Sequence, residues 1–499
     1  MLISKNWLEY FINLEDKSAQ EIADKLTLST LEIEGYEDQA ENLENMVVGE
    51  IKEIKDHPDA DNLEICMTDI GDELVQIICG GSNIEEGLKV AVAKIEAKVR
   101  WHGEGELVEL EETEIRGEKS RGMIAAANEI GLEDNFPMEN EKEILDLSNM
   151  GAEVGADLAQ AVGQDDVIFE IDNKSMSRRP DLWGHYGIAR ELTVLFDREL
   201  KDYDPKEIDS NKQNKLEIEV KNKNLANRYM AVSLSDVEVK ESPQWLKDKL
   251  QAVDIESVNN IVDITNFVLM ELGQPMHAFD RSKLASNKII VRNAQAGEKI
   301  TTLDDSELEL SEKNLVIADE EKPIALAGII GAKNSQVDEN TDEIILESAN
   351  FDRVNIRKTA MEFGLRTDSS ARFEKGQDPN NAELGLKRAV ELIKQVCPKA
   401  EVTIEVVDKS NFELDQGPIE ITHDYIQSKI GAEISQEKIT DILTSLEFEV
   451  EQKEHKFLVT VPTFRATVDI TQKEDLVEEI ARIYGYNEIE SSLPKFKIE

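Results

Sequence analysis

Residues 18–27 read Ser-Ala-Gln-Glu-Ile-Ala-Asp-Lys-Leu-Thr, and residues 435–444 read Ser-Gln-Glu-Lys-Ile-Thr-Asp-Ile-Leu-Thr. Both stretches begin with serine, a favoured N-cap residue, and both carry apolar residues at helical spacing. Leu-Glu-Ile-Glu (31–34) follows the first stretch and Leu-Glu-Phe-Glu (446–449) follows the second. Each stretch therefore predicts a helix followed by a strand, and together they indicate a duplicated module. A chance match between two amphipathic helices is the alternative.

The two copies differ in how the chain continues after this helix and strand. The second copy continues directly into a predicted strand at 457–461 and an acidic helix at 475–482. In the first copy the corresponding strand, 167–171, and helix, 181–190, appear only after a long intervening stretch. We therefore predict a helical module split into residues 1–39 and 152–196, and a second, winged-helix-like helical module over residues 411–486.

The inserted segment, residues 40–151, is rich in strand-like runs, which are 46–54, 63–70, 74–79, 90–93 and 107–115. Turn signals such as His57-Pro58 and Gly80-Gly81 separate them. Five short strands in such a segment suit a small barrel of the OB-fold type. Residues 211–390 mix strands and helices and predict a separate mixed α/β domain. The fold class expected for the chain is α+β with several domains.

The chain is strongly acidic, with 105 Asp and Glu against 56 Lys and Arg and a formal net charge of −49. A function in RNA binding then requires local basic patches, because phosphate binding depends on Lys and Arg that displace counterions. Three basic clusters exist, at 116–121, 174–179 and 353–375. We interpret the excess acid as an adaptation of the solvated surface, with a saline cytoplasm as the hypothesis.

The remaining composition excludes several protein classes. The first residues lack the charged start and apolar run of a signal peptide, and no stretch reaches the length of a membrane span. A cytoplasmic protein without a membrane partner is expected. Three cysteines without a C-x-x-C pair fit neither a disulfide framework nor a Cys-rich zinc site.

Several motifs along the chain together resemble those of one protein family. The predicted barrel carries His-Pro-Asp-Ala-Asp-Asn-Leu (57–63), Ile-Cys-Gly-Gly-Ser-Asn-Ile (78–84) and Ile-Arg-Gly-Glu-Lys-Ser-Arg-Gly-Met (115–123), which are similar to the tRNA-binding barrel of several synthetases. The mixed domain carries Val-Asp-Ile-Thr-Asn (262–266), Gly-Gln-Pro-Met-His-Ala-Phe-Asp (273–280) and Arg-Phe-Glu-Lys-Gly (372–376). The last module carries Asp-Leu-Val-Glu-Glu-Ile-Ala-Arg-Ile-Tyr-Gly-Tyr (475–486). In their order along the chain, these motifs resemble the bacterial phenylalanyl-tRNA synthetase β-subunit family.

The resemblance implies a ligase that joins phenylalanine to its tRNA as an (αβ)₂ heterotetramer. No Phe-Arg-x-Glu motif of a class II active site occurs, so ATP binding and aminoacylation are expected in the α subunit. Family β subunits continue into a catalytic-like and an anticodon-binding domain, of which only the start, 487–499, is expected here. A stand-alone tRNA-binding deacylase that edits in trans, or an inactive fragment, are the alternatives.

For this chain the resemblance implies hydrolysis of tyrosine wrongly attached to the phenylalanine tRNA, in the domain at 211–390. Glu347 is the implied acceptor of the tyrosine hydroxyl, and His277 would orient or polarise a water molecule. The other implied pocket residues are Thr265, Asn266, Ala327, Gly328, Gly331, Thr367 and Ser369. Glu256 departs from the pattern, because a basic residue is expected there. A turn histidine and turn glycines are the alternative for these positions.

Two further sites are expected. Asp475, Glu478 and Glu479 are spaced so that three carboxylates share one helix face, and crowded carboxylate oxygens suit Mg²⁺. The resemblance places Mg²⁺ at these residues and Asp469; a solvated acidic face is the alternative. In the barrel, the candidate tRNA-binding residues are Trp101, His102, Arg116, Lys119 and Arg121, through phosphate contacts and stacking. A barrel that serves only as a spacer remains the other possibility.

Overall fold

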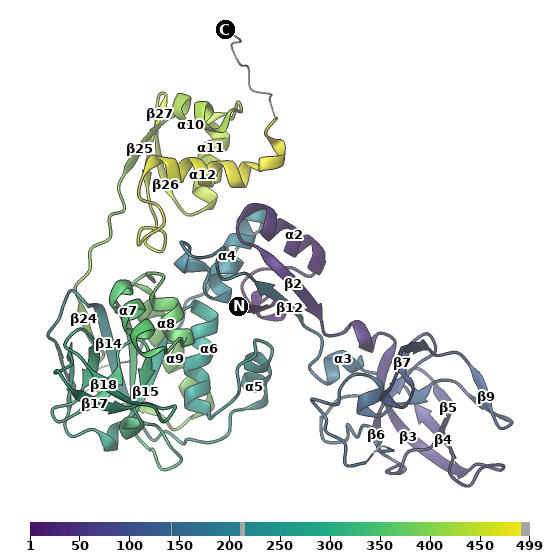
Figure 1. The fold of residues 1–499 in the computed structure, drawn as a ribbon. Helices are drawn as coiled ribbons and strands as arrows, with labels where there is room; N and C mark the ends of the chain where they lie inside the picture. The colour runs from purple at the N-terminus through teal and green to yellow at the C-terminus, as the bar shows by residue number, and fades with distance from the viewer. Residues whose placement is uncertain (141, 210–214, 491–499) are drawn as a thin grey trace. The chain divides into compact units, whose positions relative to one another are not determined.

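The computed structural model describes residues 1–140, 142–209 and 215–490. The chain divides into two compact units, residues 36–168 and residues 1–35 with the chain from Phe169 onward. Figure 1 shows the order of the elements along the chain. No helix in the described part of the chain combines the length and the apolar character needed to cross a bilayer.

The two copies of the predicted module have the same strand order. In the first copy the sheet runs β1 (Leu2–Ser4), β12 (Val167–Ile171), β2 (Ile33–Asp38), and in the second it runs β25 (Ile419–Thr422), β27 (Lys456–Thr460), β26 (Glu449–Lys453). Thus in both copies the third strand along the chain lies between the first two. The predicted helices are confirmed as α2 (Ala19–Ser29), capped by the Ser18 hydroxyl, and α11 (Gln436–Ser445), capped by the Ser435 hydroxyl.

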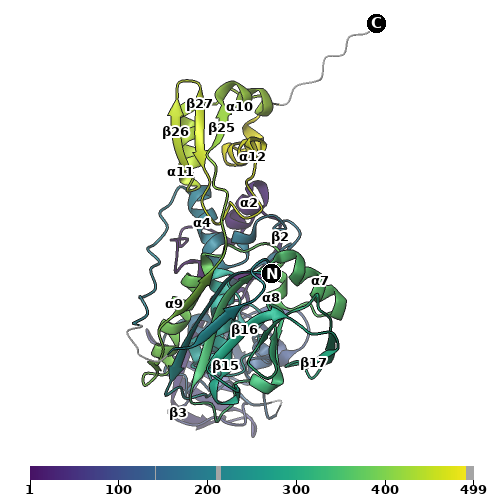
Figure 2. The same cartoon turned by 90° about the vertical axis from the view of Figure 1, so that its left-hand side faces the viewer.

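The remaining helices complete each copy. The first contains α1 (Lys5–Leu8), the 3-10 turn η4 (Pro180–Leu182) and α4 (His185–Phe196), and the second contains α10 (His423–Ile430), α12 (Lys473–Tyr484) and the 3-10 turn η7 (Tyr486–Glu488). Figure 2 shows the second copy as a three-stranded sheet with its helices packed beside it. The helix predicted at 181–190 begins later, at His185. Gly184 before it is extended, with φ −157°, and packs so closely on the backbone of Gly273 that a Cβ would lie 2.4 Å from the Gly273 nitrogen.

The unit at 36–168 contains a five-stranded antiparallel sheet in the order β11 (Met123–Ile124), β6 (Lys89–Ala93), β3 (Met46–Asp56), β4 (Glu64–Asp69), β5 (Leu74–Cys79). The two ends of this sheet come together. The Arg121 amide, just before β11, donates to the Gln76 carbonyl of β5 at 2.9 Å, and the Ile78 amide of β5 donates to the Ser120 hydroxyl at 3.0 Å. The sheet is therefore a nearly closed barrel. The unit also contains α3 (Leu158–Ala161) and the 3-10 turns η1 (Glu41–Leu43), η2 (Trp101–Gly103) and η3 (Ala127–Glu129).

The prediction of a single strand at 107–115 is wrong. That stretch forms two short strands, β8 (Leu107–Glu109), which pairs with β7 (Lys98–Arg100), and β9 (Thr113–Ile115), which pairs with β10 (Glu118–Ser120). All three residues of β8 are exposed, so this segment has no buried face that would hold it in the barrel. The fifth strand of the barrel is β11 instead.

The mixed domain contains two larger sheets. One runs β13 (Glu217–Val220), β16 (Lys288–Asn293), β19 (Leu315–Ala318), β20 (Pro323–Leu326), β21 (Ile330–Gly331). The other runs β15 (Met276–Asp280), β22 (Ile344–Phe351), β14 (Ala226–Ser235), β23 (Glu401–Val402), and β24 (Val407–Ser410) also pairs with β14. A separate hairpin joins β17 (Glu298–Thr301) and β18 (Glu307–Leu310), and 3-10 turns lie at η5 (Arg281–Lys283) and η6 (Lys333–Ser335).

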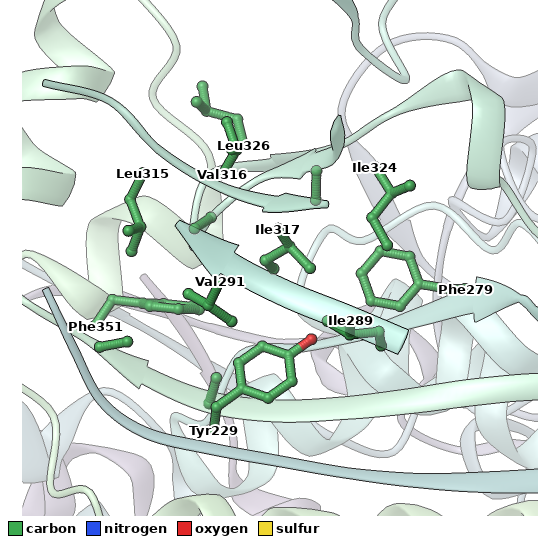
Figure 3. Packing of buried hydrophobic residues seen from close by; sticks show 14 of the residues in the cluster. Tyr229, Phe279, Ile289, Val291, Leu315, Val316, Ile317, Ile324, Leu326 and Phe351 are labelled. Carbon is green, nitrogen blue, oxygen red and sulfur yellow. The ribbon is translucent and has the colours of Figure 1, made fainter. Parts of the chain in front are cut away.

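One apolar core joins these two sheets. Figure 3 shows the ring of Tyr229 from β14 among Ile289, Val291 and Phe279, all fully buried. The helices of the domain are α5 (Gln244–Gln251), α6 (Asn260–Leu272), α7 (Arg353–Phe363), α8 (Asp368–Phe373) and α9 (Asn381–Val396). Helices α6 and α9 lie side by side against the sheet that contains β15 and β22 (Figure 1).

Candidate active site

A cavity of about 360 Å³ opens in the mixed domain. Its walls come from helix α6, strands β15 and β22, the turn between β20 and β21, and helix α8. Most of the lining is aliphatic, including Val262, Ile317 and Leu326, and a few polar side chains face it. This combination of apolar walls and few polar groups is the usual composition of a small-molecule site.

Glu347 lies in the middle of β22, opposite Ala231 of β14 and His277 of β15. Its side chain is buried, and the Tyr229 hydroxyl donates to one carboxyl oxygen, Oε2, at 3.0 Å. No cation lies beside it in the described part of the chain. Burial raises the pKa of Glu347 to about 8, and the hydrogen bond from Tyr229 opposes this only in part. At neutral pH this carboxyl group is therefore mostly protonated.

His277 faces the same cavity from the neighbouring strand. Burial lowers the pKa of His277 to about 4, so the imidazole is neutral at pH 7. Its Nε2 atom is buried and has no hydrogen-bond partner among the described residues. Gly331 makes this position possible, because a Cβ there would lie 2.4 Å from His277 Cε1. A neutral imidazole with one unused nitrogen can accept from or donate to a bound water or hydroxyl.

Helix α6 supplies Thr265 and Asn266. The helix begins after Asn259, whose side chain accepts from the amides of Ile261 and Val262, so its first turn is fixed. The Thr265 hydroxyl donates to the Val262 carbonyl at 2.6 Å, which leaves its lone pairs available. Both residues line the cavity.

Glycines shape the opposite wall. Gly328 has φ +67°, a conformation that favours glycine, and a Cβ there would lie within 3.0 Å of Ile356, Phe351 and Phe373. The Thr367 hydroxyl donates to the Ile329 carbonyl at 2.8 Å and also accepts from the Ser370 amide as the N-cap of α8. Thr367 thus ties the glycine turn to α8.

The structure brings most of the predicted pocket residues to this one cavity, which Thr265, Asn266, His277, Gly328, Gly331, Glu347 and Ser369 all line. Ala327 and Thr367 lie directly beside the lining, Ala327 in the core and Thr367 behind the turn. Glu256 is exposed and is not part of the lining. Sequence reasoning missed Gln336, which lines the cavity, and Tyr229, which holds Glu347.

Three family models match separate parts of the chain. A putative tRNA binding domain matches residues 46–153, a B3/4 domain matches 225–398, and a tRNA synthetase B5 domain matches 419–486. The cavity lies in the B3/4 match.

Curated relatives match nearly the whole chain. The phenylalanine–tRNA ligase beta subunit of Oceanobacillus iheyensis is 37% identical over 501 residues, which is 99% of this chain and 60% of the relative. Those of Clostridium acetobutylicum and Staphylococcus aureus (strain USA300) are 39% and 38% identical over 99% of this chain and 61% of each relative. The chain belongs to the phenylalanine–tRNA ligase β-subunit family. This confirms the family predicted from the motifs, and the chain spans about 60% of the length of these relatives.

In the B5 region of this family member, the four carboxylates expected to hold Mg²⁺ line one cavity of about 390 Å³. In the described residues, no group of three or more His, Cys, Asp or Glu side chains is placed to hold a metal ion. Arg465 pairs with both Asp469 and Glu479, and Arg482 donates to Glu479 at 2.9 Å. Asp475 accepts from the amides of Thr471 and Gln472 at the start of α12, and Glu478 is exposed. Arginines therefore occupy oxygens of Asp469 and Glu479, whereas Asp475 accepts from backbone amides and Glu478 is exposed.

The charge of Glu479 is set by these partners. Burial alone would raise its pKa, but Arg465 and Arg482 outweigh burial and hold the pKa of Glu479 well below its usual range. Burial also raises the pKa of Asp469, to about 6, because Arg465 and Arg179 oppose it less strongly. Glu479 is therefore a charged member of an ion-pair network.

In the region that matches the tRNA binding domain, most of the cationic side chains predicted to bind tRNA form ion pairs with acidic side chains. Lys119 pairs with Glu112 at 3.0 Å, and Arg121 pairs with Glu73 at 3.0 Å. The Arg116 guanidinium donates to the Asp59 carbonyl at 3.1 Å. Trp101 is half exposed and packs edge-on against His102 at 5.6 Å between ring centroids. The aromatic pair is accessible for stacking, whereas the cations are already partnered.

Proposed function

We propose that this chain forms the tRNA-binding and proofreading part of a phenylalanine–tRNA ligase β subunit, and that its cavity hydrolyses tyrosine wrongly attached to the phenylalanine tRNA. The observation that carries the proposal is Glu347, a buried carboxyl group inside an otherwise apolar cavity, with Tyr229 as its one hydrogen-bond partner among the described residues. Membership of the family and the B3/4 match support it.

Selectivity depends on that carboxyl group. The hydroxyl of a bound tyrosine would pair with the oxygen of Glu347 that Tyr229 leaves open, as an acceptor when this carboxyl group is protonated and as a donor when it is ionised. Phenylalanine fills the same apolar space but leaves the buried oxygen unpaired. A site built to hydrogen-bond a substrate hydroxyl can reject the analogue that lacks it by about 10⁴–10⁵-fold. Tyrosine is therefore held long enough to be hydrolysed, and phenylalanine is not.

The hydrolytic step uses a water molecule. Gly328 and Gly331 have no side chains of their own and so give the ester room to approach the backbone, and Thr265 and Asn266 contact its polar end. His277 orients the water through its unused Nε2. The water oxygen bonds to the ester carbon and the bond to the tRNA oxygen breaks. The released tRNA oxygen takes the proton that the attacking water gives up and becomes a hydroxyl, and free tyrosine leaves.

The other parts of the chain take roles that the family suggests. We propose an OB-type barrel at 40–151 that contacts tRNA through Trp101, His102, Arg116, Lys119 and Arg121. The split module at 1–39 and 152–196, the editing domain at 211–390 and the winged-helix-like module at 411–486 are the proposed boundaries. Residues 487–499 are the proposed start of a catalytic-like domain, and 491–499 lie outside the described residues.

The whole enzyme would be an (αβ)₂ heterotetramer in the cytoplasm, with ATP bound by the α subunit. Magnesium binding at Asp469, Asp475, Glu478 and Glu479 stays a prediction of the resemblance, and no step of the editing reaction depends on it. Co-purification of the chain with an α subunit tests the assembly.

The proposed activity is tested by release of tyrosine from tyrosyl-tRNA for phenylalanine by the purified chain, at low and at high KCl. Phenylalanyl-tRNA is the control substrate. Fast release of tyrosine with slow release of phenylalanine is expected. Equal rates for the two esters, or no release by the folded chain at either salt concentration, would contradict the proposal.

A further inference from the structure

Helix α7 (Arg353–Phe363) supports one wall of the candidate active site. Its buried residue Ile356 contacts the turn at Gly328, where a Cβ would lie 2.8 Å from Ile356 Cδ1. The chain then passes through Arg366 to α8, whose Ser369 lines the cavity. Figure 2 shows α7 beside α8, in agreement with the contacts between the two helices.

The outer face of α7 is basic. Ile356, Thr359 and Ala360 are the buried residues of the helix, and Arg353, Arg357 and Lys358 lie on the exposed side. Arg366, in the loop after the helix, is exposed as well. Two exposed apolar side chains, Val354 and Met361, lie on the same side and are 47% and 72% exposed. The surface therefore combines cations with apolar contact area.

The four cations have no acidic partner among the residues that the structure describes. None of Arg353, Arg357, Lys358 and Arg366 makes an ion pair or a side-chain hydrogen bond with the part of the chain that the structure describes. This is unexpected in a chain with a net charge of −49, in which the cations Lys119 and Arg121 of the barrel both have acidic partners.

The carboxylates closest in sequence have other partners. Asp352 accepts from the Asn355 amide at 2.7 Å as the N-cap of α7. Glu362 accepts from the Asn314 side chain at 2.9 Å, and Asp368 pairs with Arg372 at 2.9 Å. These local arrangements leave the cations of α7 open to an external anion.

We propose that the exposed face of α7, together with Arg366, binds the phosphate backbone of the tRNA next to its 3′ end and so delivers the terminal aminoacyl group to the cavity. The inference rests on the proposed function, because it identifies the RNA segment that must lie at the mouth of the same site. Guanidinium groups bind phosphates in a bidentate manner and stack on bases, and Val354 and Met361 offer apolar contact to an unstacked base. An acidic protein segment could also bind a basic surface. RNA is the partner expected here, because the surface lies beside a cavity proposed to take an ester of tRNA.

The first test measures tRNA binding by the full chain as a function of salt. In the variant Arg353→Gln/Arg357→Gln/Lys358→Gln, we expect at least a tenfold weaker binding and a smaller salt dependence. Each lost phosphate contact lowers the slope of log K against log[salt] by about 0.7 for single strands. The control Lys240→Gln/Lys247→Gln/Lys453→Gln removes the same charge from three lysines that pair with Glu238, Glu241 and Glu451. It should leave binding within about twofold of the wild type.

A second test separates the surface from the cavity. Hydrolysis of tyrosine esterified to the terminal adenosine alone should proceed at the wild-type rate in the α7 variant, whereas KM for full-length tyrosyl-tRNA should rise about tenfold. The single variant Arg366→Gln, at an exposed position, should shift KM in the same direction by a smaller factor. Failure of the wild type to hydrolyse either ester would overturn the proposed function, and the binding data would still decide on α7. Unchanged affinity and salt slope in the triple variant would overturn the α7 proposal.

Discussion

Glu347 and Glu479 are both buried glutamates, yet their surroundings shift their pKa values in opposite directions. Glu347 has a tyrosine hydroxyl as its partner and no cation, and burial raises its pKa to about 8. Glu479 is held between Arg465 and Arg482, which keep its pKa well below the usual range. Burial costs a carboxylate its solvation in both places, so the neighbouring charges decide the outcome. A carboxyl without a cation is available to a ligand, whereas one between two arginines stabilises the fold.

The largest expected effect is on stability at the ion-paired glutamate. Glu479→Ala would leave Arg465 and Arg482 buried without their shared partner, and breaking a buried pair in this way costs about 3–5 kcal/mol. Glu347→Ala should cost much less, because it also removes a carboxyl group that is costly to bury. Denaturant unfolding of the two variants measures the difference. Equal losses of stability would contradict the contrast between the two sites.

The pH dependence of stability should have opposite signs at the two residues. The folded pKa of Glu347 is raised, so its contribution is fully present below pH 4.5 and is lost as the pH rises toward 8. The folded pKa of Glu479 is depressed, so its contribution is present above pH 4.5 and is lost as the pH falls through the folded value. The effect at Glu347 is on the order of a few kcal/mol.

Unfolding free energies of the wild type, Glu347→Gln and Glu479→Gln between pH 3 and pH 9 test these signs. Glu347→Gln should flatten the decline toward pH 8 and leave the acid side unchanged, and Glu479→Gln should do the reverse. A Glu347→Gln profile parallel to that of the wild type would show that this carboxyl does not titrate as described.

The smallest expected effect comes from Tyr229. Its hydrogen bond lowers the pKa of Glu347, so Tyr229→Phe should raise that pKa further at a stability cost of about 1 kcal/mol. The selectivity for tyrosine over phenylalanine should fall. Selectivity should also increase with pH as Glu347 ionises and becomes a stronger acceptor, and this increase should move to higher pH in the variant. The pH profile of ester hydrolysis reads this shift directly. A profile unchanged by Tyr229→Phe would mean that Tyr229 is only part of the core.

Local sequence patterns predicted helices and strands well where a few neighbouring residues, such as an N-cap serine, determine where the element begins. The N-cap serines at 18 and 435 placed α2 and α11, and the resemblance named Glu347 and His277, which the structure brings to one cavity. The prediction of one barrel strand at 107–115 was wrong, because the residues of β8 are all exposed and so have no buried face that would hold the segment in the barrel. Contacts between distant residues were also out of reach, since no local pattern shows that Tyr229 meets Glu347 or that Arg465 meets Glu479.

The same limit applies to charge. The cluster at 116–121 and the cluster at 353–375 look alike in the sequence. The first is largely paired with acidic residues, whereas four cations of the second, on α7 and the loop after it, have no acidic partner in the described part of the chain. Pairing depends on which carboxylates the fold brings near, such as Glu73 beside Arg121. The number of basic residues in a stretch therefore does not predict a phosphate-binding surface.

The central claim is that Glu347 distinguishes tyrosine from phenylalanine in the cavity. The direct measurement is the single-turnover hydrolysis rate of tyrosyl- and phenylalanyl-tRNA by the wild type, by Glu347→Ala and by the control Glu343→Ala, a glutamate four residues away that does not line the cavity. We predict that Glu347→Ala lowers the ratio of the two rates by at least about 100-fold, mainly through faster loss of phenylalanine and slower release of tyrosine, while Glu343→Ala keeps it. An unchanged ratio in Glu347→Ala would remove this carboxyl group from the mechanism.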